Sequence, residues 1–159
     1  KNMWNSKPFK TKKMTTLELK IEINAPKEKV WDVLWNEETY KQWTSIFCEG
    51  SYAVSDWKEG SKIQFLTPNG DGMNSIIYKK IDNEYMAFKH LGEIKKFEEK
   101  PVDDATQEWV GAREMYHLTE DKGITVLEAK MDSVEKYIDY FKTTWPKALD
   151  LVKKLSEEK

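Results

Sequence analysis

The chain ends in a long series of apolar residues that a helix would place on one side. They recur at steps of three or four residues, which fits the period of an amphipathic helix: Val134, Ile138, Phe141, Trp145, Leu149, Val152 and Leu155. Ser133 is the expected N-cap, and Pro146 is expected to kink the helix. One apolar side of this length must be covered by another element, so the rest of the chain has to supply a matching surface.

The preceding sequence predicts an antiparallel sheet with one apolar face. Residues 15–24 alternate between apolar and charged side chains, as a half-buried strand does. Two short helices are expected over residues 25–47, the second with Asn36 as its N-cap. Strand patterns continue from residue 49 to 131. Charged, irregular residues 92–106 interrupt them and predict a long exposed loop.

This order predicts an α+β fold. A curved antiparallel sheet of about seven strands would wrap around the long C-terminal helix, with two short helices after the first strand. A chain of 159 residues suits one domain, which we place at residues 15–159. Regular patterning begins just after Met14. Residues 1–14 are therefore interpreted as an N-terminal extension or a cloning remnant.

Composition excludes several classes of function. The 26 basic and 28 acidic residues nearly balance, which argues against nucleic acid as a partner. No apolar run approaches the roughly 18 residues that a membrane span needs. The single cysteine, Cys48, fits a reducing, cytoplasmic setting. Two histidines and one cysteine offer no metal-ligand spacing, and no glycine-rich phosphate loop occurs, so neither a metal nor a cofactor is expected.

Several stretches in order resemble one superfamily. They are "IEINAPKEKVWDVL", "YKQW", "GSKIQF", "NEYMAFKH" and "WPKALDLVKKL". Together they resemble the START-like (SRPBCC) superfamily, also called the helix-grip or Bet v 1-like fold, over residues 15–155. Within it they are most similar to the branch related to the C-terminal domain of the Hsp90 ATPase activator Aha1. The resemblance implies a sheet curled around the long helix, with a cavity between them that binds an apolar small molecule in many members.

Three functions are compatible with this fold, because a fold does not fix a function. The first is the binding of an apolar or aromatic small molecule between sheet and helix. The second is a cyclase-like or hydratase-like enzyme that uses Glu114 as acid and base. The third, implied by the resemblance, is regulation of an Hsp90-type chaperone. The sequence favours binding ahead of catalysis, and a monomer or weak homodimer is expected.

Large rings are the candidate lining of such a cavity. Strand phase and the helix pattern select Trp43, Phe65, Phe88, Tyr116, Phe141 and Trp145. The alternative is that these rings fill the interior completely. Trp109 is out of phase with Tyr116, and it joins the lining only if Gly111 forms a bulge that exchanges the two faces of the strand.

Glu114 is the most informative polar residue. In the stretch "WVGAREMYHL" it has the same phase as Tyr116 and Leu118, so its carboxylate is expected to face inward. Such a group must be paired, hydrogen-bonded, protonated or hydrated. One interpretation is a polar anchor or general acid and base inside the cavity. The other is a position at the rim, or a hydrogen bond to a nearby Tyr or Trp.

His90 is the second polar candidate, because it shares a face with Met86 and Phe88. It is interpreted either as a ligand contact or as a histidine of the core or rim. If its strand and that of Glu114 form a hairpin centred near residue 99 or 100, His90 faces residue 109 or 110. The offset from Glu114 is then about 13–17 Å. A direct pair of His90 with Glu114 is therefore not expected.

Overall fold

Eight strands form one antiparallel sheet in residues 14–159, the part of the chain that the computed structural model describes. Along the chain the elements are β1 (Met14–Ile23), α1 (Lys27–Trp35), α2 (Glu37–Thr44), β2 (Tyr52–Val54), β3 (Lys62–Leu66), β4 (Gly72–Ile81), β5 (Tyr85–Lys95), β6 (Glu98–Glu99), α3 (Asp104–Gln107), β7 (Arg113–Asp121), β8 (Ile124–Val134) and α4 (Glu135–Glu157). The strand order is β1-β8-β7-β5-β4-β3-β2, and the short β6 pairs with β5. The predicted α+β fold is confirmed. The predicted extension falls on residues 1–13, outside the described residues, and on Met14, the first residue of β1.

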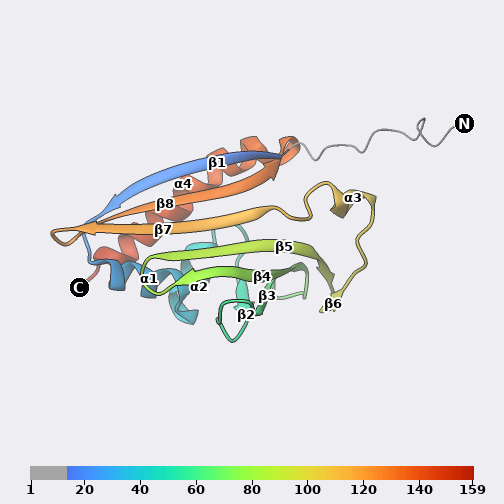
Figure 1. Ribbon diagram of the computed structural model, residues 1–159, viewed down its shortest axis with the longest axis horizontal. Helices are drawn as coiled ribbons and strands as arrows, with labels where there is room; N and C mark the ends of the chain where they lie inside the picture. The colour runs from blue at the N-terminus through green and yellow to red at the C-terminus, as the bar shows by residue number, and fades with distance from the viewer. Residues whose placement is uncertain (1–13) are drawn as a thin grey trace, which may run out of the picture.

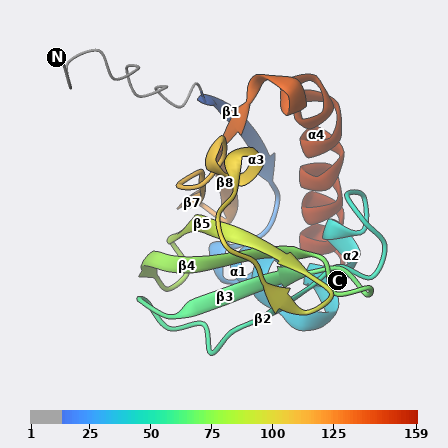
Figure 2. The ribbon, with the colours of Figure 1, turned by 90° about the vertical axis from the view of Figure 1, so that its right-hand side faces the viewer.

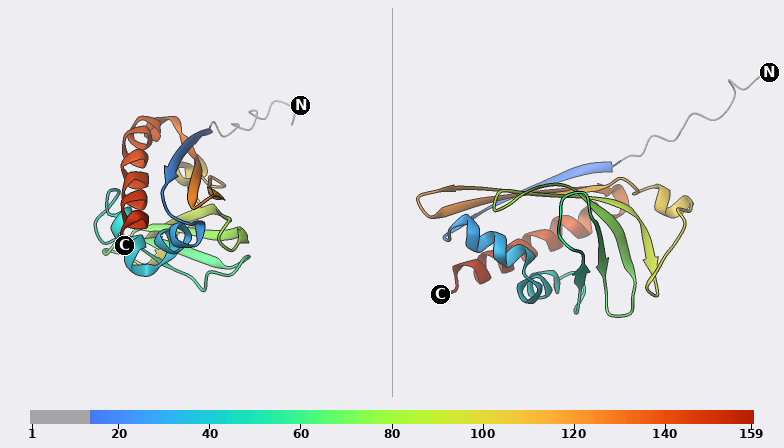
Figure 3. Two further views of the ribbon diagram at one scale, coloured as in Figure 1. Left: turned by 90° about the vertical axis from the view of Figure 1, so that its left-hand side faces the viewer. Right: turned by 60° about the horizontal axis from the view of Figure 1, so that its bottom comes forward.

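Helix α4 passes behind β1 and β8 in Figure 1, and the view in Figure 2 shows that the sheet bends around it. In Figure 2, β1, β8 and β7 form one wall, and β5, β4, β3 and β2 turn away from it to form a second. Helix α4 stands opposite the first wall, and α1 and α2 lie beside its C-terminal end (Figure 3). The chain thus encloses the space between α4 and the two walls of the sheet.

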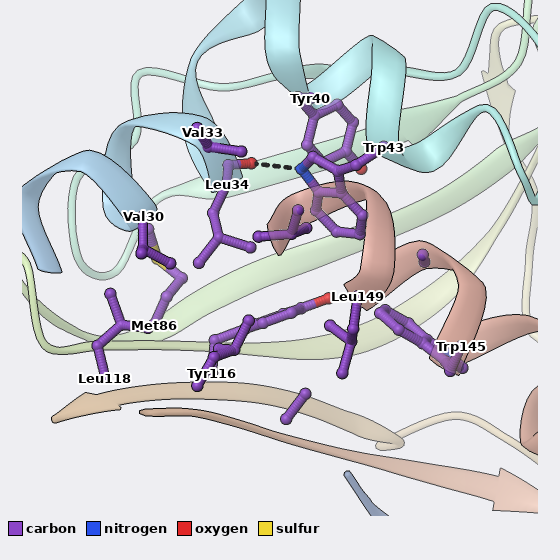
Figure 4. Packing of buried hydrophobic residues seen from close by; sticks show 14 of the residues in the cluster. Val30, Val33, Leu34, Tyr40, Trp43, Met86, Tyr116, Leu118, Trp145 and Leu149 are labelled. Carbon is purple, nitrogen blue, oxygen red and sulfur yellow. Dashed lines mark hydrogen bonds between the residues drawn. The ribbon is translucent and has the colours of Figure 1, made fainter. Parts of the chain in front are cut away.

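The core lies where the C-terminal part of α4 meets α1, α2 and the inner face of the sheet (Figure 4). Leu127, Ala129 and Met131 of β8 are buried, so alternate residues of this strand face the core. Trp43 of α2 is 1% exposed, and its Nε1 donates to the carbonyl of Leu34 at 3.1 Å. Each apolar side chain that is fully buried in this way contributes about 1.5–3 kcal/mol to stability.

Helix α4 divides at Pro146 into two parts with different surroundings. After Pro146, Ala148, Leu149 and Val152 are buried against the core. Before it, much of the helix surface is exposed, including Tyr137. A proline has no backbone N–H to continue the hydrogen bonding of the helix. The two parts therefore meet at the one helical position that cannot donate a backbone hydrogen bond.

Helix α4 begins one residue later than predicted. Ser133 is not its N-cap but a residue of β8, paired with Thr15 of β1. Its hydroxyl donates to the carbonyl of Val134, and Val134 takes the N-cap position without a side-chain cap. The strand continues past the predicted boundary because β1 provides hydrogen-bond partners as far as residue 134.

The loop predicted over residues 92–106 is partly strand. β5 continues to Lys95 and turns back into β6 through Lys96 and Phe97, both with positive φ (50° and 67°). Two consecutive positive φ values are typical of a tight hairpin turn. Ile94, which is 1% exposed, anchors this extension. The high charge of the segment hid this buried residue, and residues 100–103 form a loop before α3.

Candidate functional site

A cavity of about 450 Å³ lies between the N-terminal part of α4, helix α2 with the residues that follow it, and the inner face of the sheet. This volume is within the range of about 300–1,000 Å³ that is usual for small-molecule sites. Tyr137 and Tyr140 of α4 belong to its lining and are 46% and 47% exposed. The cavity therefore reaches the molecular surface beside α4.

Most of the residues selected from the sequence meet in this cavity. Seven of them line it: Trp43, Phe65, His90, Trp109, Glu114, Phe141 and Trp145. Phe88 and Tyr116 do not belong to the lining, and both are fully buried. The Phe88 ring packs edge-on against Phe65 at 5.1 Å between centroids, one layer behind the wall. The interior is therefore solid behind Phe65 and hollow in front of it.

Trp109 reaches the cavity by a route that differs from the predicted bulge. β7 begins only at Arg113, so Trp109 lies in the turn that precedes the strand. Gly111 has a φ of +91° in this turn, a conformation that glycine adopts at little cost. Its N–H donates to the carbonyl of His90 at 2.7 Å, which attaches the turn to the middle of β5. The turn, rather than strand alternation, directs Trp109 toward the cavity.

The prediction that His90 and Glu114 lie far apart is wrong. His90 Nε2 is 3.4 Å from Glu114 Oε1. β5 pairs with β7 so that Phe88 is opposite Glu114, and the N–H of His90 donates to the carbonyl of Ala112. The hairpin is thus centred at residue 101, one to two residues beyond the predicted centre. The offset falls to two residues, which makes His90 and Glu114 diagonal neighbours on one face.

Glu114 and His90 belong to a larger hydrogen-bonded group. Ser75 Oγ lies 2.7 Å from His90 Nδ1, and the Tyr116 hydroxyl donates to Glu114 Oε2. Ser75 is fully buried and His90 is 6% exposed. The carboxylate faces the cavity and the serine lies behind it. This order is the reverse of a nucleophilic triad, in which the serine must reach the substrate.

Two tyrosines near Glu114 hold their protons. Burial, followed by the charge of the Glu114 carboxylate, raises the pKa of Tyr40 well above its usual value. Burial also raises the pKa of Tyr116, and the charge and hydrogen bond of Glu114 raise it further. Both phenols are therefore neutral near neutral pH and are able to donate a hydrogen bond. The site joins a carboxylate, an imidazole and two phenols at the edge of an aromatic cavity.

Comparison with known families agrees with this architecture. A family model described as activator of Hsp90 ATPase homolog 1-like protein matches residues 24–157. The chain belongs to this family. The resemblance to the Aha1 branch of the START-like superfamily is thereby confirmed. No curated protein sequence matches the chain.

Solved structures share the fold of this Aha1-like chain. The Aha1 dimer from Colwellia psychrerythraea has a TM-score of 0.68 at 18% identity, over 90% of this chain and 96% of that one. A protein from Cytophaga hutchinsonii has a TM-score of 0.65 at 27% identity, over 90% and 94%. DynU16, from the dynemicin biosynthetic locus, has a TM-score of 0.63 at 13% identity, over 87% and 46%. These similarities support the helix-grip fold that the sequence predicts.

Sequence reasoning missed an ion pair in the lining of this Aha1-like cavity. Arg113 Nε donates to Asp132 Oδ2 at 2.9 Å, and the Thr16 hydroxyl donates to Asp132 Oδ1 at 2.6 Å. Burial alone would raise the pKa of Asp132, but the hydrogen bonds from Arg113 and Thr16 outweigh it and lower the pKa. Neither Arg113 nor Asp132 interrupts an apolar pattern, so alternation gave no signal for them.

Removal of the Asp132 charge is expected to have a pH-dependent effect. A lowered folded-state pKa means that the carboxylate stabilises the fold above the ordinary Asp pKa of about 3.9, and that this contribution is lost as pH falls through the folded value. Asp132→Asn is expected to cost about 1–2 kcal/mol near neutral pH, and the difference from wild type should shrink below about pH 4. Urea unfolding at several pH values measures this, with exposed Asp139→Asn as the control. A difference that does not change with pH would contradict the assignment.

Residues 14–159 contain neither a metal-binding cluster nor a membrane-spanning helix. No group of three or more His, Cys, Asp or Glu side chains in this part of the chain is arranged to hold a metal ion. None of its helices combines the length and the apolar character that a membrane crossing requires.

Proposed function

We propose that this Aha1-like protein binds an apolar or aromatic small molecule in the cavity between the sheet and α4. The observation that carries the proposal is a cavity of about 450 Å³ whose lining includes Trp43, Phe65 and Trp145, with Glu114 in the same wall. Apolar walls with a few placed polar groups are the usual composition of a small-molecule site. DynU16 has the same fold and comes from a biosynthetic locus, a setting in which small molecules are bound or converted.

Native mass spectrometry of freshly purified protein is the direct test. We expect a co-purifying ligand in the wild type and its loss in Ala112→Leu, because Ala112 lines the cavity and a larger side chain there occupies ligand volume. Ala105→Leu introduces the same side chain at an exposed position outside the lining and should retain the ligand. Equal ligand content in the two variants would contradict the proposal, once circular dichroism shows that both are folded.

One observation favours a second function, proton transfer on a bound molecule. His90 Nε2 and Glu114 Oε1 are 3.4 Å apart, and an imidazole beside a carboxylate is a pair that can pass a proton to or from a bound molecule. The fully buried Ser75 is not placed to attack a substrate, so covalent catalysis is not part of this alternative. Catalysis would appear as a loss of turnover in Glu114→Gln that exceeds the loss of ligand affinity.

Two expectations about macromolecular partners stay predictions. Regulation of an Hsp90-type chaperone follows from membership of the family, and a weak homodimer is compatible with the dimer described for the Colwellia psychrerythraea protein. A chaperone interaction that persists in Ala112→Leu would separate an interaction module from a ligand carrier, because that substitution changes the cavity and leaves the outer surface intact.

A further inference from the structure

The donor and the acceptor can be assigned for each hydrogen bond around Glu114. Among the described residues, His90 Nδ1 is the one hydrogen-bond partner of the Ser75 hydroxyl, and Ser75 is fully buried. A buried hydroxyl needs an acceptor for its proton. The Ser75 hydroxyl therefore donates to Nδ1, which places the imidazole proton on Nε2 in neutral His90.

This tautomer points the imidazole toward the carboxylate. His90 Nε2–H faces Glu114 Oε1 at 3.4 Å, while the Tyr116 hydroxyl donates to Oε2. The donors thus run from Ser75 through His90 to Glu114, and from Tyr116 to Glu114. Both series end on the same carboxylate. What this group of residues presents to the cavity is a hydrogen-bond acceptor.

The Glu114 carboxylate can accept further hydrogen bonds. Its two oxygens can accept about four hydrogen bonds, and the described residues supply the Tyr116 bond and the longer His90 contact. Glu114 lines the cavity, so the remaining acceptor positions are available to a ligand. The neighbouring Tyr40 also lines the cavity, and its hydroxyl has no hydrogen-bond partner among the described residues. The Glu114 carboxylate, which accepts, and the Tyr40 phenol, which can donate, therefore border the same space.

We propose that the ligand carries a hydroxyl group on its apolar or aromatic body, which donates to Glu114 and accepts from the Tyr40 hydroxyl. This inference rests on the proposed function and specifies the ligand class for the same cavity. Ser75 and His90 act as positioning residues, because they orient the carboxylate and need not touch the ligand.

Other polar groups fit this pair less well. A ligand carboxylate would be repelled by Glu114, and an ether or ketone has no hydrogen to give it. An ammonium brings a full charge and three N–H groups that must be stripped of water. A ligand hydroxyl has one hydrogen to donate to Glu114 and lone pairs to accept from Tyr40. These two residues therefore satisfy its hydrogen bonds, and the ligand carries no charge that would have to be desolvated.

Calorimetric titration with four naphthalene probes tests the proposal. We expect 2-naphthol to bind wild type about tenfold or more tightly than 2-methoxynaphthalene or naphthalene, since a hydrogen bond to a charged acceptor has an effect of this size. The fourth probe, 2-naphthylmethylamine, is expected to bind more weakly than 2-naphthol. Glu114→Gln and Tyr40→Phe should each reduce the 2-naphthol preference several-fold and leave naphthalene binding unchanged. Glu38→Gln, at an exposed position of α2, should change nothing.

The outcomes separate this inference from the proposed function. If naphthalene and 2-naphthol bind wild type equally, the hydroxyl preference is overturned and the apolar cavity site stands. Tighter binding of the amine overturns the hydroxyl assignment in favour of a cationic ligand. If none of the probes binds, the cavity function and this inference are both overturned.

The positioning role has its own measurement. The chain has two histidines, so the ¹⁵N NMR spectrum of the imidazoles is simple to assign. We expect His90 to be protonated on Nε2 in the wild type, and Ser75→Ala to increase the population of the other tautomer. His117, which is exposed, should be the same in both proteins and serves as an internal control. A wild-type His90 protonated on Nδ1 alone would overturn the direction of the hydrogen bonds.

Discussion

Gly72→Ala is expected to destabilise the protein by about 3 kcal/mol or more. A Cβ atom added at Gly72 would lie 1.8 Å from the carbonyl oxygen of Phe65. That oxygen belongs to the backbone of β3, which pairs with β4 through Leu66 and Gly72. The strands would have to separate to admit the methyl group. Because Phe65 and Gly72 also line the cavity, the same change should deform its wall.

Gly92→Ala is the matched control, because Gly92 is also a strand glycine. The nearest atoms to a Cβ added there are the Asn74 Nδ2 at 3.7 Å and the Lys100 carbonyl oxygen at 3.9 Å, which are ordinary contacts. The free energy of unfolding of Gly92→Ala is expected to stay within about 1 kcal/mol of wild type. Urea unfolding of the two variants measures the difference. Equal stabilities would show that β3 can move away from residue 72 at little cost.

Trp43→Ala is expected to cost about 3–5 kcal/mol, the usual loss for a large buried ring. Trp43 is 1% exposed, donates to the Leu34 carbonyl, and packs against Tyr40 at 5.4 Å and Trp145 at 6.2 Å between ring centroids. It is part of the core and of the cavity lining at the same time. Its removal should therefore enlarge the cavity as well as lower stability.

Two controls separate the contributions of Trp43. Trp43→Phe keeps most of the volume and loses the hydrogen bond to Leu34, so its cost should be smaller, about 1–2 kcal/mol. Trp31→Ala removes the same ring from a partly exposed position and should also cost less. Thermal and urea unfolding of the three variants rank their losses of stability. A loss in Trp31→Ala as large as that in Trp43→Ala would contradict the role of burial.

Most of the fold could be predicted because its signals are periodic. The spacing that includes Leu149 and Val152 identified α4, and the alternation of residues 15–24 identified β1, since both patterns arise from burial on one side. The details that failed depend on partners distant in the sequence. Ser133 belongs to β8 because β1 continues to pair with it. β5 extends past residue 92 because β4 pairs with it as far as Ile94.

In the candidate site, too, periodic features could be predicted and contacts between distant residues could not. Alternation placed Glu114 on the inner face, where the structure also has it, in the cavity lining. Its contact with His90 was missed, because the distance depends on the register of β5 and β7, which local sequence does not determine. The fully buried Ser75 gave no signal of a partner for the same reason. Inward-facing residues could be predicted singly, whereas hydrogen-bonded groups spanning three strands could not.

The register of β5 and β7 has a consequence for how such a protein can vary. The strand pairing, together with the hydrogen bonds of Gly111 and Ala112 to His90, fixes the contact of His90 with Glu114, and residues 100–109 lie outside these pairings. Insertions, deletions or substitutions in this segment can therefore change what surrounds the cavity, including Trp109, without moving the carboxylate. Selection, or an engineer, can alter ligand size and shape in the connecting segment while the polar group inside stays in place.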